Sequence, residues 1–180
     1  MSPRKRCPSW TVAEADRLEG VQYTGQAVLL PEEGSDESGD ELDFGTFEIG
    51  YKRIIVSEAS TPNNNPVISG FTVEGLLIDA DTVVEVDAGQ AYELGLELPE
   101  ATIEEYEYIN PDGVLEIRVE EPFASWYATD GEALESTTLY PFLQADWTAP
   151  DAAGVEGSWY AVVRDRRGGI AWIQRSWRTR

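Results

Sequence analysis

Carboxylates are the most abundant reactive groups in this sequence, and their grouping determines which chemistry they could support. The 180-residue chain contains 34 Asp and Glu residues against 13 Lys and Arg residues. Calcium binds clustered oxygen ligands, and one stretch supplies four carboxylates, those of Asp79, Asp81, Glu85 and Asp87. A second stretch comprises Asp36, Glu37, Asp40, Glu41 and Asp43. Neither has the spacing of an EF-hand or of glycine–aspartate repeats, so calcium stays an unsupported option and a solvated acidic surface is favoured.

The composition offers few of the residue combinations that catalytic sites require. Two carboxylates across a cleft could hydrolyse a glycosidic bond, but among 34 of them some pair will always lie at a suitable distance. The chain has no histidine and one cysteine, which excludes Ser-His-Asp and Cys-His nucleophile systems and zinc sites built on histidine or several cysteines. No glycine-rich phosphate loop is present. We therefore predict that the protein is not an enzyme and uses no cofactor.

The C-terminal segment brings tryptophan and arginine together, a combination typical of contact surfaces. Trp172 and Trp177 fall on opposite faces of a strand expected over residues 170–177, so one of the two rings should be exposed. The sequence predicts a contact surface formed by Trp172, Arg175, Trp177 and Arg178.

Other aromatic residues fit the interior better than a binding site. Trp126 lies in an expected strand over residues 123–128, and we predict that it packs between two sheets. A carbohydrate-stacking platform is the alternative for this ring. Trp159, Ala161 and Val163 share one face of their strand and are expected to point inward.

The net charge of −21 excludes some partners and is spread unevenly. Nucleic acid and anionic membrane surfaces are disfavoured because both require a cationic surface. No apolar run is long enough to span a membrane. Between Ile54 and Val163 the only cation is Arg118. One hypothesis is that the Arg-rich end docks on an acidic face of another copy or of a partner, and a saline habitat would screen the self-repulsion.

The elements that would position these residues are strands. Side chains alternate with a period of two after residue 20, most clearly at Tyr92, Leu94, Leu96 and Leu98. Residues 110–113 (Asn-Pro-Asp-Gly) predict a hairpin turn. Residues 166–169 predict a second one, in which Asp165 accepts hydrogen bonds from turn N–H groups. The other strands are expected at 21–30, 46–57, 67–73, 76–78, 83–86, 91–98, 137–143, 145–148 and 159–164.

This pattern predicts an all-β protein, an antiparallel immunoglobulin-like β-sandwich with an irregular N-terminal extension. Residues 1–43 form the extension, which includes the acidic loop and a short helical turn that Thr11 and Glu14 could cap. Residues 44–180 form the sandwich.

Four segments resemble the immunoglobulin-like domains of bacterial cell-envelope lipoproteins: 51–75, 126–131, 147–154 and 162–172. The resemblance implies an extracytoplasmic, non-catalytic module that holds contacts through sheet faces and edges, with a protein partner or self-association. It makes Cys7 the candidate lipid anchor, although no signal-peptide apolar region stands behind the basic start.

Two alternatives stay open. By size, charge and fold class the chain is also similar to jelly-roll capsid proteins or tail proteins of viruses from saline habitats, which implies a virion structural role. The third class is a carbohydrate-binding or small-ligand-binding module.

Overall fold

The computed structural model describes residues 21–29, 48–56 and 61–180, without 111, 113 and 134. The chain divides into two compact units, Met1–Ala59 and Ser60–Arg180. In the first, β1 (Val21–Leu29) pairs antiparallel with β2 (Glu48–Val56) over their whole length. Cys7, the helical turn and the acidic loop lie outside the described residues. The sandwich expected from residue 44 onward begins later, because β2 belongs to the first unit and, among the described strands, pairs only with β1.

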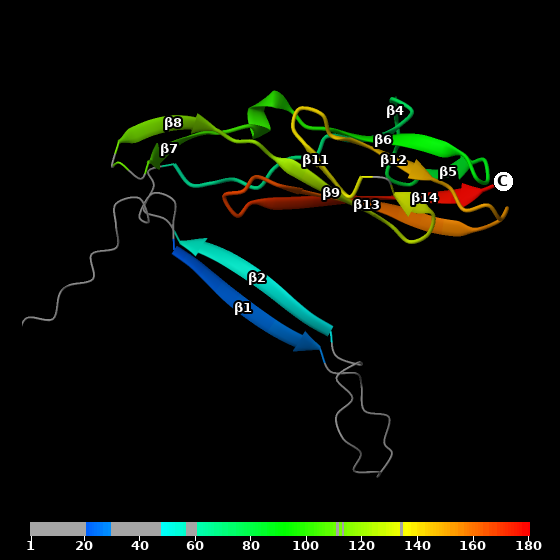
Figure 1. The fold of residues 1–180 in the computed structure, drawn as a ribbon, viewed down its shortest axis with the longest axis horizontal. Coiled ribbons are helices and arrows are strands. Elements are labelled where there is room, and N and C mark those ends of the chain that lie inside the picture. Colours follow the sequence, from blue (N-terminus) through cyan, green and yellow to red (C-terminus); the bar gives the residue numbers. More distant parts are fainter. Residues whose placement is uncertain (1–20, 30–47, 57–60, 111, 113, 134) are drawn as a thin grey trace, which may run out of the picture. The chain divides into compact units, whose positions relative to one another are not determined.

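The second unit is a sandwich of two five-stranded sheets (Figure 1). We name each sheet after a central strand. In order across each sheet, the β6 sheet contains β10 (Glu132–Ala133), β12 (Gln144–Thr148), β6 (Ala91–Glu97), β3 (Gly70–Val73) and β4 (Leu76–Leu77). The β13 sheet contains β11 (Thr137–Leu139), β9 (Phe123–Ala128), β13 (Glu156–Arg164), β14 (Ile170–Thr179) and β5 (Val83–Val86).

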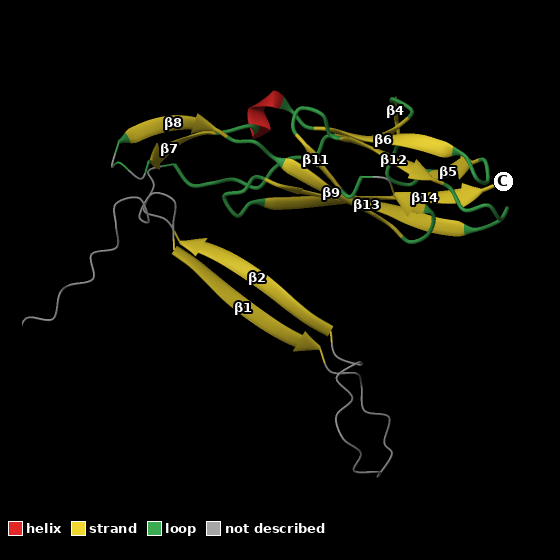
Figure 2. Cartoon of the chain, viewed as in Figure 1, coloured by secondary structure: helices red, strands yellow, loops and turns green. Residues whose placement is uncertain are grey.

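The all-β sandwich predicted from the sequence is confirmed. Within the described part of the chain the only helical element is a 3-10 turn, η2 (Glu100–Thr102), visible in red in Figure 2. The strands of the sandwich pair antiparallel with one exception, since β5 runs parallel to β14 at the edge of the β13 sheet. Among the described residues no helix is long and apolar enough to cross a membrane.

The hairpin expected at residues 110–113 is present and forms a separate two-stranded ribbon. β7 (Glu105–Ile109) pairs with β8 (Leu115–Val119). The Asn110 side-chain oxygen accepts bonds from the backbone N–H of Asp112 at 3.0 Å and of Val114 at 2.9 Å. This turn fixes the register, because asparagine can replace backbone acceptors in a tight turn.

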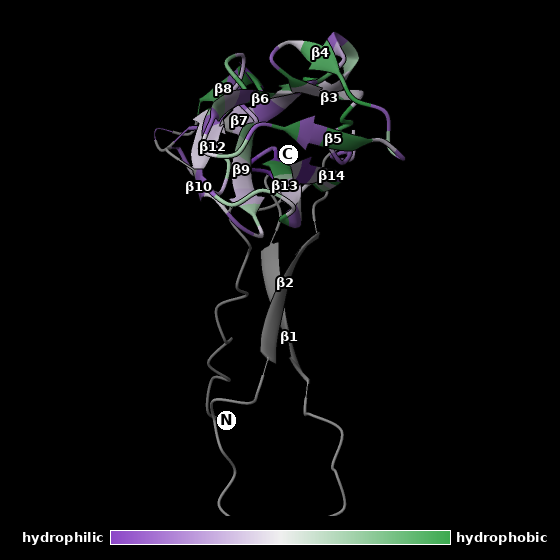
Figure 3. Ribbon diagram, turned by 90° about the vertical axis from the view of Figure 1, so that its right-hand side faces the viewer, coloured by the Kyte–Doolittle hydropathy of each residue, from purple (hydrophilic) through white to green (hydrophobic). Residues whose placement is uncertain are grey.

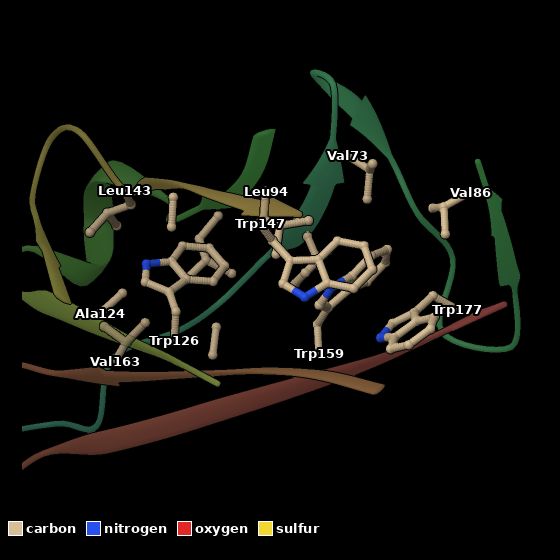
Figure 4. Close-up of a cluster of buried hydrophobic side chains, with 14 of the residues drawn as sticks. Val73, Val86, Leu94, Ala124, Trp126, Leu143, Trp147, Trp159, Val163 and Trp177 are labelled. Carbon is tan, nitrogen blue, oxygen red and sulfur yellow. The ribbon is translucent and has the colours of Figure 1, made fainter. Parts of the chain in front are cut away.

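Large aromatic rings fill the space between the two sheets (Figure 4). Trp147 of the β6 sheet lies 4.9 Å, centroid to centroid, from both Trp159 and Trp177 of the β13 sheet. Phe71 on β3 stacks on Trp159 at 5.9 Å. Such rings bury large apolar areas and add favourable edge and stacking contacts. The core is therefore held by contacts that cross from one sheet to the other.

The inward residues predicted from the sequence are confirmed. Trp126 is buried and contacts Phe71 edge-on, and its indole N–H donates to Thr138 Oγ1 at 2.9 Å. Trp159, Ala161 and Val163 are fully buried. This buried position of Trp126 is incompatible with the alternative of a carbohydrate-stacking platform at that ring.

The tight turn between β13 and β14 also forms as expected. Asp165 Oδ1 accepts the backbone N–H of Arg167 at 2.8 Å and of Gly169 at 2.9 Å. Its other oxygen accepts from Asn63 Nδ2 at 2.7 Å. Asp165 is buried, and a buried carboxylate needs such partners because its desolvation is costly. The turn is thereby tied to the segment that precedes β3.

The edges of both sheets are short. The edge strands of the β6 sheet, β4 and β10, are two residues each, while β11 and β5 at the edges of the β13 sheet have three and four. Short edge strands give an incoming chain few unpaired backbone groups. The faces of the sandwich therefore offer more contact area than its edges.

Replacing a core ring should cost far more stability than replacing an exposed one of the same type. Trp159→Ala should lower the free energy of unfolding by about 3–5 kcal/mol, because it removes a ring that contacts both sheets. Trp172→Ala is the matched control, and at protein concentrations too low for self-association it should change this free energy by no more than about 0.5 kcal/mol. Urea unfolding followed by circular dichroism measures both, and equal losses would contradict the assignment of inside and outside.

Candidate functional site

The last strand separates the four residues predicted as a contact surface. Trp172 is 66% exposed and Trp177 is 1% exposed, so the expectation that one ring would be accessible is confirmed. The inclusion of Trp177 in the surface was wrong, because an odd spacing of five places it on the opposite face. There it packs against Trp147 and Trp159 in the core.

The two arginines divide in the same way. Arg178 lies six residues from Trp172 and shares its face. Arg175 lies on the inner side, where its Nε donates to the carbonyl oxygen of Ile78 at 2.9 Å. Ile78 follows β4 of the other sheet. Arg175 therefore links the two sheets, and the predicted surface reduces to Trp172 and Arg178.

The register adds residues from neighbouring strands that the sequence analysis did not connect with Trp172. Val162 on β13 lies opposite Trp172, and Tyr160 lies opposite both Gln174 on β14 and Tyr127 on β9. The outer face of the β13 sheet thus gathers apolar and aromatic side chains from four strands, β9, β11, β13 and β14. We call this set the aromatic face, and it consists of Phe123, Tyr127, Leu139, Tyr160, Val162, Ile170 and Trp172.

Charged residues stand at the two ends of this face. At one end Arg178 pairs with Glu156, to which its guanidinium donates two hydrogen bonds, and lies 3.9 Å from Glu85. At the other end the Arg164 guanidinium donates to Ser125 Oγ at 3.1 Å. The centre of the face, around Tyr160 and Trp172, carries no charge, because the outward residues there are Val162, Gln174 and serines.

The opposite side of the sandwich is chemically different. The strands of the β6 sheet contain no Lys or Arg. On its outer face Glu93 and Asp146 lie directly opposite each other on β6 and β12. Like charges in this position repel, and water or salt must screen them. The aromatic face therefore has an uncharged, apolar centre, whereas the outer face of the β6 sheet does not.

A second cluster surrounds Arg167 in the β13–β14 turn. Arg167 Nη1 donates to Glu120 Oε1 at 2.8 Å and lies 3.4 Å from Glu104 Oε2, while its guanidinium covers the Tyr106 ring at 4.4 Å. Glu104 also accepts from Asn64 Nδ2 at 2.5 Å. The cluster thus fastens the base of the β7–β8 ribbon to the turn and to the segment before β3.

The environment of Glu120 in this cluster alters its protonation. Burial raises the pKa of its carboxyl, against the hydrogen bonds from Arg167 and from the Glu104 N–H, which lower it. The negative charge of Asp165 adds to the increase. A buried carboxyl group with a raised pKa can act as a general acid. In Glu120, however, both carboxyl oxygens already accept hydrogen bonds, one from Arg167 and one from the backbone N–H of Glu104.

Of the four carboxylates considered for calcium, two already pair with arginine. Asp87 accepts from Arg180 Nε at 2.7 Å, and this hydrogen bond together with the arginine charge lowers the pKa of Asp87. Glu85 lies beside Arg178. Within the part of the chain that the structure describes, no group of three or more His, Cys, Asp or Glu residues could hold a metal ion.

The class that these observations define is an all-β sandwich with one charged and one aromatic outer face. No family model matches the chain, and no curated protein matches it. Among solved structures it is similar to a nucleoside hydrolase-related hypothetical protein from Saccharophagus degradans, described as associated with carbohydrate metabolism, at 18% identity and a TM-score of 0.44. The match covers 70% of this chain and 28% of that one. A likeness this weak decides neither fold nor function.

The raised pKa of Glu120 predicts a specific pH dependence of stability. The folded protein holds this proton more tightly than the unfolded chain, whose glutamates titrate near pH ~4.3. Relative to a Glu120→Gln variant, the wild type should therefore lose free energy of unfolding as the pH rises from about 4 through the raised pKa, and then level off. Urea titrations across this range measure the difference.

A Glu121→Gln variant is the control, since Glu121 is the exposed neighbour of Glu120. Subtracting its profile removes the general effect of deleting one negative charge from an acidic protein. A Glu120→Gln difference that stays flat, or that favours the wild type as the pH rises, would contradict the assigned direction.

Proposed function

We propose that this chain is a non-catalytic contact module of the immunoglobulin-like type, and that the aromatic face is the surface with which it binds another protein. The observation that carries the proposal is the exposure of Trp172, Tyr127 and Leu139 on one sheet face. An exposed apolar patch with a charged border has the anatomy of a protein interface, whose centre is apolar and whose rim is polar.

The order of strands supports an immunoglobulin-like topology. Such domains place strands A, B, E and D in one sheet and C, F and G in the other. The orders β3-β6-β12-β10 and β14-β13-β9 correspond to these two sets. Trp126 on β9 also takes the place of the buried tryptophan that such domains carry on strand C. The chain has a single cysteine, so edge-on and tilted tryptophan contacts supply the cross-sheet link that a disulfide makes in antibody domains.

The buried carboxylates support a role without catalysis. Glu120 and Asp165 both accept hydrogen bonds from residues of the surrounding loops. These bonds join separate segments of the chain. Their removal would be expected to loosen the fold before it changed any chemistry.

For the location we propose the cell envelope, with the resemblance to envelope lipoprotein domains as its support. Cys7 is the lipid anchor that this proposal implies, and it lies outside the described residues. Metabolic labelling with a fatty-acid analogue tests the anchor, and a Cys7→Ser variant is its control. Absence of label, with the protein found in the cytosolic fraction, would refute the envelope location.

A site-specific photo-cross-linker tests the contact surface in cells. An unnatural aromatic cross-linking residue in place of Trp172 should give one defined protein adduct, because the ring lies at the centre of the proposed interface. The same residue in place of Leu76 is the control, since Leu76 is 70% exposed on β4 of the other sheet, where Figure 3 shows the ribbon in the colour of hydrophobic residues. No adduct at Trp172, or equal adducts at both positions, would refute the proposal.

A carbohydrate-binding module is the second candidate, and the aromatic row favours it. Tyr127, Tyr160 and Trp172 lie on three adjacent strands, and flat rings of this kind present broad apolar surfaces with polar tips. A glycan array, with tryptophan fluorescence as a second readout, tests this candidate. Binding that Trp172→Ala abolishes would favour it over the protein contact.

The β7–β8 ribbon supports a virion subunit as the third candidate. Leu115, Ile117 and Val119 share one face of β8, and all are more than half exposed. A projecting arm with an apolar stripe could lock neighbouring subunits together. Light scattering at high salt tests this role, because a shell or tube subunit assembles into large particles.

A further inference from the structure

The charges at the two ends of the aromatic face indicate which molecule binds there. We infer that the face binds a second copy of this chain, aromatic face on aromatic face, about a two-fold axis that lies in the interface and runs across the strands. The inference rests on the proposed function, since it names the partner for the same surface. Three observations support it: the extent of the face, its charge pattern and the chemistry of the opposite sheet.

The face supplies a large part of the area that a stable dimer needs. β13 pairs with β14 over all nine of its residues, so the face extends about 30 Å along the strands. The four strands that carry the face differ in length, with three residues in β11, six in β9, nine in β13 and ten in β14. At about 3.3 Å per residue and about 4.8 Å between strands, they cover roughly 440 Å² before the relief of the side chains is counted. A standard interface buries about 800 Å² on each partner. The aromatic face supplies roughly half of that area, and the charged residues at its two ends add to it.

The charges at the two ends are self-complementary. At one end Arg164 points outward from β13. Beside it Arg166, 5.8 Å from the Phe123 ring, lies 4.0 Å from Glu121, so this end keeps an excess positive charge. At the other end Arg178 stands between two carboxylates, those of Glu85 and Glu156, which leaves an excess negative charge. A two-fold axis across the strands reverses the strand direction. It therefore places Arg164 of each copy over the Glu85–Glu156 end of the other, and the pairing occurs twice.

The opposite sheet argues against an alternative mode of self-association. If the arginines docked on the acidic β6 sheet of a neighbour, the aromatic centre would cover Glu93 and Asp146. Burying carboxylates against this centre is costly, because its tyrosine hydroxyls and the Trp172 N–H are neutral donors and leave the negative charge without a countercharge. That contact would also be heterologous, so it would extend into rings or filaments instead of closing as a dimer. The isologous arrangement buries rings against rings and leaves the acidic face in water.

Salt should strengthen the face-to-face dimer, and the effect of salt distinguishes this dimer from docking of arginines on the acidic β6 sheet. Each copy carries a formal charge of −21, so two copies repel each other at low ionic strength. Screening removes this repulsion and leaves the apolar contact intact, hence the dissociation constant should fall on the order of tenfold between about 0.05 and 1 M NaCl. Docking of arginines on the acidic sheet shares this repulsion but depends on charge attraction, which the same screening removes, so salt would strengthen that arrangement less or would weaken it.

Sedimentation equilibrium of the full chain measures the association. We expect a dimer that tightens with salt. A monomer at all salt concentrations up to a protein concentration of about 0.5 mM would overturn the inference, since such an interface should be far tighter than millimolar. Oligomers that grow without limit, or a dimer that weakens with salt, would also overturn it.

Two sets of variants locate the interface. Trp172→Glu should raise the dissociation constant on the order of 100-fold, because it places a carboxylate between two apolar faces. Leu76→Glu makes the same change on the other sheet and should leave the constant within about twofold. Circular dichroism checks that both variants fold. Equal effects of the two substitutions would overturn the assignment.

A charge exchange tests the axis. Arg164→Glu alone makes both ends of the face negative and should weaken the dimer. Adding Glu156→Arg to Arg164→Glu exchanges the positive and the negative end of the face and should restore part of the affinity of the dimer. No restoration in the double variant would overturn the antiparallel arrangement. If the cross-linker at Trp172 instead captures a different protein, the contact function holds and the self-association is refuted.

Discussion

The alternation of side chains along β13 is the constraint on which the rest of this structure depends. β13 lies between β9 and β14, so its side chains on one face must fill the interior and those on the other must face outward. Trp159 and Val163 join the core, while Tyr160 and Val162 join the aromatic face. The same pleat that closes the sandwich therefore builds its candidate binding surface, and a shift of register by one residue would exchange the two.

The uneven distribution of charge acts on the same strands. Apart from Arg118, every cation of the sandwich lies from Arg164 onward, and several of them reach carboxylates on other segments. Arg167 ties the β7–β8 ribbon to the turn, and Arg180 ties the end of the chain to Asp87. The exposed Arg180–Asp87 pair contributes little by itself, whereas Glu120 is buried against Arg167 and that pair holds the ribbon in place. In a chain with such an acidic excess both pairs also remove local repulsion. The arginines of the β13–β14 hairpin thus offset part of the negative charge of the sandwich, and they do so at the β13 sheet.

Much of the fold was predictable because it rests on local patterns. The hairpin at Asn110, the Asp165 turn and the inward position of Trp126 all follow from short sequences whose physics is local: turn residues with side-chain acceptors, and alternation of apolar with polar residues. Strand limits were less accurate. The strand expected to continue to Leu143 ends at Leu139, because the chain then turns and the Phe142 N–H donates to the carbonyl oxygen of Leu139.

The sequence by itself determined that Trp172 and Trp177 point to opposite sides of one strand, since the pleat is a property of the chain alone. Only the tertiary structure decided which of the two is buried. That choice depends on Trp147 and Trp159, which come from strands far away in the sequence. The same is true of Arg175, which bonds to Ile78 of the other sheet, and of the parallel pairing of β5 with β14. Pairing between distant segments is set by the packing of the whole core, and no local pattern records it.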